Sequence, residues 1–135
     1  MSEPLAAREP LVGVVVCHGG LAAALVDAVE HISGLRDVLI PVSNTGCDRA
    51  SLEERVDAAV AGRPAVVFVD MATGSCLFAA LHRVRAHATA EADVKVVTGV
   101  NLPMLVDFVF NRALAPAEAA QRALAVGERT IRVPS

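Results

Sequence analysis

Cysteines, lysines and long hydrophobic runs are all scarce in this sequence of 135 residues. The three cysteines, Cys17, Cys47 and Cys76, cannot all pair, so a disulfide framework is not expected. The apolar run over residues 11–17 is far shorter than the roughly 20 residues that span a bilayer. These scarcities predict a reduced protein that does not insert into a membrane.

Basic charge is also in short supply. Twelve basic residues face fifteen acidic ones, for a net charge of −3, which gives no reason to expect binding to nucleic acid. Residues 1–10 hold two acidic residues and two prolines but no basic block, so we expect a flexible lead-in rather than a signal peptide. With 54% hydrophobic and 20% charged residues, residues 11–135 are expected to form a single globular domain in the cytoplasm.

What is present is an alternation of apolar runs and amphipathic segments. We predict strands over residues 11–17, 37–42, 65–69 and 94–98, and a short final strand over 129–133. Helices are predicted over residues 21–32, 51–61, 75–87, 103–112 and 116–126. A capping box at residues 51–54 marks the start of the second helix, and Gly127 is the expected C-cap of the last. The pattern predicts a doubly wound α/β fold with a mainly parallel sheet of four strands, and the final strand at its edge.

Polar side chains and glycines follow three of the predicted strands, in residues 17–20, 70–75 and 98–103. The carboxyl ends of parallel strands share one edge of the sheet, and ligands bind there, so we expect these segments to meet. His18 ends the first strand and is followed by two glycines and a helix, whose N-terminus favours an anion such as phosphate.

His18 and Asp70 are the candidate catalytic residues. A neutral imidazole nitrogen is a good nucleophile toward phosphorus, and a carboxylate bonded to the other ring nitrogen would fix the tautomer. The turn after Asp70 could supply backbone N–H groups and a hydroxyl to the phosphoryl group. The candidate phosphate-binding residues are Gly19, Thr73, Gly74, Ser75 and Asn101.

The three segments resemble the enzyme IIA domain of the mannose class of the phosphoenolpyruvate-dependent sugar phosphotransferase system. The family pattern places Ser-His-Gly after one strand, Asp-x-x-Gly-Gly-Ser-Pro-x-Asn after another, and Gly-Val-Asn-Leu/Ile-Pro-Met-Leu after a third. Here the corresponding residues are 17–19, 70–78 and 99–105, and the last segment matches throughout.

The resemblance implies a phosphocarrier that needs no cofactor. The histidine matching His18 would accept a phosphoryl group from phospho-HPr and pass it to an enzyme IIB domain, while the aspartate matching Asp70 orients it. The family is also dimeric and exchanges its last strand between subunits, which suits residues 129–133. Association with a membrane permease complex would accompany transport, without membrane insertion of this chain.

Three residues depart from the family pattern: Thr73 replaces a glycine, Cys76 a proline and Phe78 an asparagine. Thr73 is expected to restrict the turn, because a β-branched residue resists positive φ. The departures leave a second interpretation open, a phosphorylation-dependent regulator in an incomplete phosphotransferase system, with Met71 and Phe78 in its docking surface. A nucleotide-binding flavodoxin-like domain is a weaker alternative, since no phosphate-loop signature is present.

Cys17 and Cys76 each lie beside a motif, so a thiol pair or a Cys/His metal site is conceivable. No second histidine and no closely spaced pair of ligands supports such a site, however. The simpler interpretation is that both cysteines are small buried apolar residues with a structural role only. The sequence therefore predicts no metal site.

Overall fold

The computed structural model describes residues 9–86 and 93–135 and contains one parallel sheet of four strands. The strands are β1 (Val12–Cys17), β2 (Leu39–Ser43), β3 (Ala65–Val69) and β4 (Val94–Val97). Their order across the sheet is β2-β1-β3-β4, and every pair runs parallel. The predicted parallel α/β sheet is confirmed, with strand ends within two residues of those expected.

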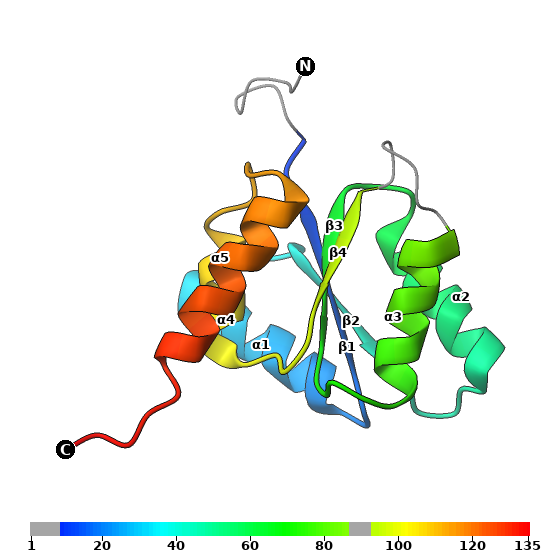
Figure 1. The fold of residues 1–135 in the computed structure, drawn as a ribbon, viewed down its shortest axis with the longest axis horizontal. Coiled ribbons are helices and arrows are strands. Elements are labelled where there is room, and N and C mark those ends of the chain that lie inside the picture. Colours follow the sequence, from blue (N-terminus) through cyan, green and yellow to red (C-terminus); the bar gives the residue numbers. More distant parts are fainter. Residues whose placement is uncertain (1–8, 87–92) are drawn as a thin grey trace.

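Helices cover both faces of this sheet (Figure 1). The described residues form five: α1 (Leu21–Ser33), α2 (Arg49–Val60), α3 (Ser75–Ala86), α4 (Leu102–Val109) and α5 (Pro116–Arg129). In Figure 1, α1, α4 and α5 lie on one side of the sheet, and α2 and α3 lie on the other. The doubly wound arrangement is therefore confirmed.

The two central strands, β1 and β3, are buried on both faces, which is why they read as unbroken apolar runs. Their side chains alternate between two cores. Val15, Cys17 and Phe68 join the core beneath α1, α4 and α5, while Val14 and Val16 join the core beneath α2 and α3. Gly13 leaves room for a close approach, because a Cβ there would lie 2.7 Å from the ring of Phe108.

The order of the strands indicates where on the sheet a ligand would bind. From β1 the chain moves to β2 on one side, and β3 leads to β4 on the other, so the direction of winding reverses between β1 and β3. Ligands of open α/β sheets bind at such a switch point, outside the carboxyl ends of the strands. His18 and Asp70 directly follow these two strands.

The start of α2 differs from its prediction. Asp48 is the N-cap, and its side chain accepts a hydrogen bond from the Ser51 N–H at 2.8 Å and another from the Ser51 hydroxyl at 2.7 Å. The predicted capping box at Ser51 is therefore wrong, because an acidic residue three positions earlier satisfies that end of the helix.

The ends of the last two helices also differ. α4 ends at Val109, three residues earlier than predicted, because the Arg112 carbonyl and guanidinium turn to pair with the backbone of Leu11. α5 continues through Gly127, so the predicted C-cap at that residue is wrong. A Cβ at Gly127 would lie 2.5 Å from the tip of Met104, so this glycine permits close contact between α4 and α5.

The predicted strand over residues 129–133 does not form within this chain. Arg129 is the last residue of α5, and residues 131–135 have no regular secondary structure. The tail leads away from the sheet, so its backbone meets no strand edge with which to pair (Figure 1). Exchange of this strand between subunits stays a prediction.

Within residues 9–86 and 93–135, none of the helices combines the length and the apolar character that crossing a bilayer requires. The last residue of the predicted third helix, His87, lies outside the described residues.

Candidate functional site

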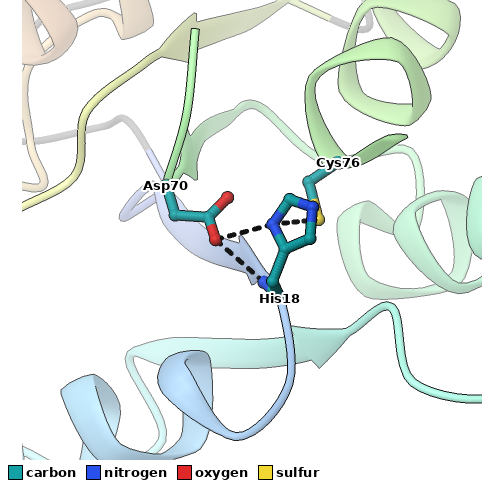
Figure 2. A group of neighbouring side chains, drawn as sticks. All are labelled: His18, Asp70 and Cys76. Atoms are coloured by element: carbon teal, nitrogen blue, oxygen red, sulfur yellow. Dashed lines mark hydrogen bonds and ion pairs between the residues drawn. The ribbon is translucent and has the colours of Figure 1, made fainter. Parts of the chain in front are cut away.

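His18 and Asp70 are in direct contact at the carboxyl edge of the sheet (Figure 2). The backbone N–H of His18 donates a hydrogen bond to Asp70 Oδ2 at 2.9 Å. The ring nitrogen Nδ1 lies 2.8 Å from the same oxygen. Since β1 and β3 are neighbours in register, with Val16 opposite Val69, the residues that follow them are held side by side.

This contact assigns the tautomer of the neutral imidazole. A carboxylate only accepts hydrogen bonds, so Nδ1 carries the proton and donates it to Asp70. The lone pair of the neutral ring is then on Nε2. The His18 side chain is 42% exposed and that of Asp70 only 10%, so a buried carboxylate holds an accessible ring. The arrangement suits a nucleophilic Nε2 whose orientation is fixed by the contact of Asp70 with the other ring nitrogen.

Burial and hydrogen bonding act on Asp70 in opposite directions. Burial raises the pKa of Asp70. Hydrogen bonds from the backbone and ring of His18, together with the charge of the imidazole, lower this pKa by a larger amount. The net result is a pKa of Asp70 below its ordinary value. The carboxylate is therefore ionised at neutral pH and able to hold the Nδ1 proton.

The lowered pKa of Asp70 predicts a pH-dependent contribution to stability. We expect the native chain to exceed Asp70→Asn in free energy of unfolding above about pH 5, where the Asp70 carboxylate is ionised in both the folded and the unfolded state. The difference should shrink as the pH falls below about 4, the ordinary pKa of an aspartate, and through the lowered pKa of the folded state. Urea denaturation at a series of pH values measures this difference. A difference that stays constant down to about pH 3 would contradict the assignment.

The turn after β3 brings Gly74 and the first residues of α3 against the imidazole. Gly74 has φ of +101°, and a Cβ built on it would lie 3.7 Å from His18 Nε2. Thr73 does not take this strained conformation, because Asp37 and Ala61 are the non-glycine residues with positive φ in the described part of the chain. The expected restriction by Thr73 is therefore absent, and the glycine that the turn needs is present.

Two residues of this edge were missed by the sequence analysis. Asn44 Oδ1 accepts a hydrogen bond from the Gly19 N–H at 3.1 Å, and its Nδ2 makes a longer contact of 3.5 Å with Ser75 Oγ. The Ser43 hydroxyl donates to the Gly19 carbonyl at 2.7 Å. Both residues stand at the carboxyl end of β2, so the rule that selected the other three strand ends applies here too.

The side chain of Asn101 makes two hydrogen bonds at the start of α4, and its predicted contact with phosphate stays a prediction. Its Oδ1 accepts from the Met104 N–H at 3.2 Å and caps α4, and its Nδ2 donates to the Gly127 carbonyl at 3.1 Å. Both ends of the amide are thus used to join α4 to α5. The structure brings Gly74 to the ring of His18 and links Gly19 and Ser75 through Asn44.

Cys76 is the nearest departure from the family pattern. Its sulfur is buried and lies 3.8 Å from His18 Nδ1 (Figure 2). Burial and the charge of Asp70 raise the pKa of Cys76 to about 11, and burial with the charges of Asp70 and Cys76 raises that of Cys17 to about 12. Both thiols stay protonated at neutral pH. His18, Asp70 and Cys76 each offer one metal-ligand atom, and these atoms lie within 4.8 Å of one another.

Apolar side chains flank this edge. Phe78 is 57% exposed and Met71 is 51% exposed. Phe78 also lines a hollow shared with Cys47, Leu52 and Ala79, between the starts of α2 and α3. Both residues are therefore available to a partner surface and are not part of the core.

One family profile matches most of the chain. The sequence profile described as the PTS system fructose IIA component, EIIA-man, matches residues 13–124. No curated protein sequence matches the chain significantly.

Several solved structures share the fold. The phosphotransferase system component EIIA from Streptococcus agalactiae is similar over 91% of this chain and 96% of its own, with a TM-score of 0.83 and 16% identity. The mannose/sorbose specific IIA subunit from Enterococcus faecalis is similar over 94% and 98%, with a TM-score of 0.77 and 19% identity. A sigma-54 interaction domain protein from Enterococcus faecalis gives 91% and 94%, with a TM-score of 0.76 and 12% identity. At these identities the likeness concerns the fold.

Proposed function

This chain belongs to the family described as the PTS system fructose IIA component, and we propose that it carries a phosphoryl group on Nε2 of His18. One observation carries the proposal: Asp70 holds Nδ1 at 2.8 Å, which leaves the Nε2 lone pair on a ring that is 42% exposed. The family resemblance supplies the donor, phospho-HPr, and the acceptor, an enzyme IIB domain.

The transfer is a displacement at phosphorus. The Nε2 lone pair forms the new N–P bond while the bond between phosphorus and the donor breaks, and the donor keeps that electron pair. The ring becomes positively charged as it bonds to phosphorus, and the Asp70 carboxylate, 2.8 Å from Nδ1, stabilises that charge. Transfer to the acceptor reverses these events. The protein is therefore both carrier and covalent intermediate.

The start of α3 offers a place for the phosphoryl oxygens. Gly74 accepts from the Phe78 N–H and so precedes the first turn, whose own N–H groups have no partner within the helix. The glycine lies against Nε2, and the helix dipole favours an anion at this end. The Ser75 hydroxyl, held near Asn44, is the side-chain donor that we assign to the phosphoryl group, and Gly19 and Thr73 complete the rim.

Phosphorylation by phosphoenolpyruvate, enzyme I and HPr tests the proposal. We expect the intact mass to rise by one phosphoryl group, with an adduct that is labile to acid and maps to His18. The variant His18→Ala should not be labelled. His82→Ala removes another exposed histidine, on α3, and should be labelled like the native chain.

Two outcomes would overturn the proposal. The first is labelling of His18→Ala at the native rate, which would place the phosphoryl group on another residue. The second is an unlabelled native chain under conditions in which the same enzyme I and HPr label an established IIA protein.

We further propose a cytoplasmic homodimer that exchanges its C-terminal tail. Ile131 and Val133 are 75% and 95% exposed in the single chain, and β4 is an edge strand of the sheet. Docking of the tail on the partner's sheet would bury these apolar side chains. Static light scattering should give twice the mass of the 14.0 kDa chain, and a monomer mass at micromolar concentration would contradict the exchange.

A second candidate function is regulation without direct transport, and the exposed Phe78 favours it. Phosphorylation of His18 would then change the charge beside Met71 and Phe78 and so select a partner. Transfer from the phosphorylated chain to cognate enzyme IIB supports the carrier in transport. A phosphorylated chain that keeps its label in the presence of IIB would support the regulator.

A further inference from the structure

The geometry points to a site for a zinc ion formed by His18, Asp70 and Cys76 (Figure 2). An imidazole, a carboxylate and a thiolate are the three ligand types that zinc takes in proteins. They come from three separate segments, the ends of β1 and β3 and the first turn of α3, so the sequence spacing gives no sign of the site.

The distances between the three ligand atoms fit a single ion. Atoms that lie within 4.8 Å of one another are all within roughly 2.8 Å of a common centre. Bonds of roughly 2.0–2.3 Å to zinc then require shifts of about half an ångström. The His18 ring, 42% exposed, has the freedom to make this adjustment, and its exposed side leaves a fourth position for water.

The charges also fit. Asp70 Oδ1 is buried and finds no hydrogen-bond partner among the residues that the structure describes. This oxygen has no access to water, so it is an unsatisfied acceptor on the carboxylate whose other oxygen, Oδ2, contacts the His18 ring. Zinc binding would release the Cys76 thiol proton to solvent. The resulting thiolate and carboxylate together neutralise the two charges of the ion, which favours binding at a partly buried position.

The consequence for His18 rests on the proposed phosphocarrier function. If zinc takes Nδ1, the proton of the neutral ring moves to Nε2, and if zinc takes Nε2, the nucleophilic lone pair itself is used. In both cases Nε2 cannot attack phosphorus. The ion would therefore inhibit phosphorylation, and the departure from proline to cysteine at Cys76 would make this chain sensitive to it.

Titration of the untagged chain with Zn²⁺ in a calorimeter, in the absence of any phosphotransferase protein, tests the site. We expect one ion per chain with a dissociation constant in the micromolar range or tighter. Co²⁺ should give the charge-transfer absorption of a metal thiolate. Cys76→Ala should weaken binding by roughly 100-fold or more, since loss of a ligand exceeds the 10–100-fold that loss of an outer partner costs. Cys47→Ala removes a cysteine outside the cluster and should bind like the native chain.

No binding by the native chain, native affinity in Cys76→Ala, or equal losses in both variants would overturn the site. The functional consequence is tested separately. Zn²⁺ should slow phosphorylation of the native chain and have far less effect on Cys76→Ala, each compared with its own rate without metal. Failure of labelling without metal would contradict the phosphocarrier and leave the calorimetric result standing, so the two proposals fail in distinguishable ways.

Discussion

Asp70→Asn is expected to lower the rate of phosphorylation by on the order of 10³–10⁴-fold, the loss that follows when the orienting carboxylate of a catalytic triad becomes an amide. In the native chain Oδ2 accepts from both the N–H and the ring of His18. Since one oxygen serves both donors, an asparagine that keeps its oxygen there is only a neutral and weaker acceptor for the Nδ1 proton, and its NH₂ group takes the buried position of Oδ1. The ring then loses the negative charge that fixes its tautomer and stabilises it as Nε2 bonds to phosphorus.

Two measurements separate this effect from damage to the fold. The imidazole ¹⁵N chemical shifts of His18 report the tautomer directly: Nδ1 should carry the proton in the native chain, and this preference should weaken in Asp70→Asn. Asp37→Asn is the matched control, because Asp37 is exposed and has φ of +61°, a conformation that asparagine tolerates. It should be phosphorylated at the native rate. A native rate in Asp70→Asn would show that Asp70 does not position the ring.

Phe108→Ala should lower the free energy of unfolding by about 3–5 kcal/mol. The side chain is 1% exposed, and its ring meets that of Phe68 edge to face, with the centroids 5.2 Å apart. The ring also packs directly over Gly13, so closely that a Cβ on Gly13 would lie 2.7 Å from it. Removal of the ring leaves a cavity between α4 and the sheet, in a core where surrounding atoms relax only partly.

Phe110→Ala is the control for this substitution. Phe110 lies two residues further along the chain but is 61% exposed, so its removal should change stability by less than about 0.5 kcal/mol. Urea denaturation followed by far-UV circular dichroism suits a chain without tryptophan or tyrosine. A loss below about 1 kcal/mol in Phe108→Ala would contradict this expectation, because it would mean that the neighbouring core side chains move in and fill the cavity left by the ring.

The sequence predicted the strands well because their signal is local. β1 and β3 are buried on both faces and therefore consist of consecutive apolar residues. Helix ends were predicted less well. A glycine such as Gly127 often caps a helix, but here it allows close packing against Met104. Which of the two roles it has depends on the neighbouring helix, which the local sequence does not show.

The candidate site, too, was predicted from the sequence only in part. That His18 meets Asp70 followed from one rule, since both end parallel strands and such ends share an edge. The sequence could not reveal that Cys76 lies 3.8 Å from Nδ1, or that Asn44 bridges Gly19 and Ser75. These contacts depend on where α3 and the loop after β2 sit relative to β1.

The sequence by itself thus determined the parallel α/β sheet and the pair His18–Asp70, because burial periodicity and strand ends are properties of short segments. The tertiary structure alone decided that Gly74 and not Thr73 takes positive φ, that Asn101 serves the α4–α5 junction, and that a buried thiol lies beside the imidazole. Each of these depends on distances between elements far apart in the chain, which are set by the register of the sheet and the packing of its helices.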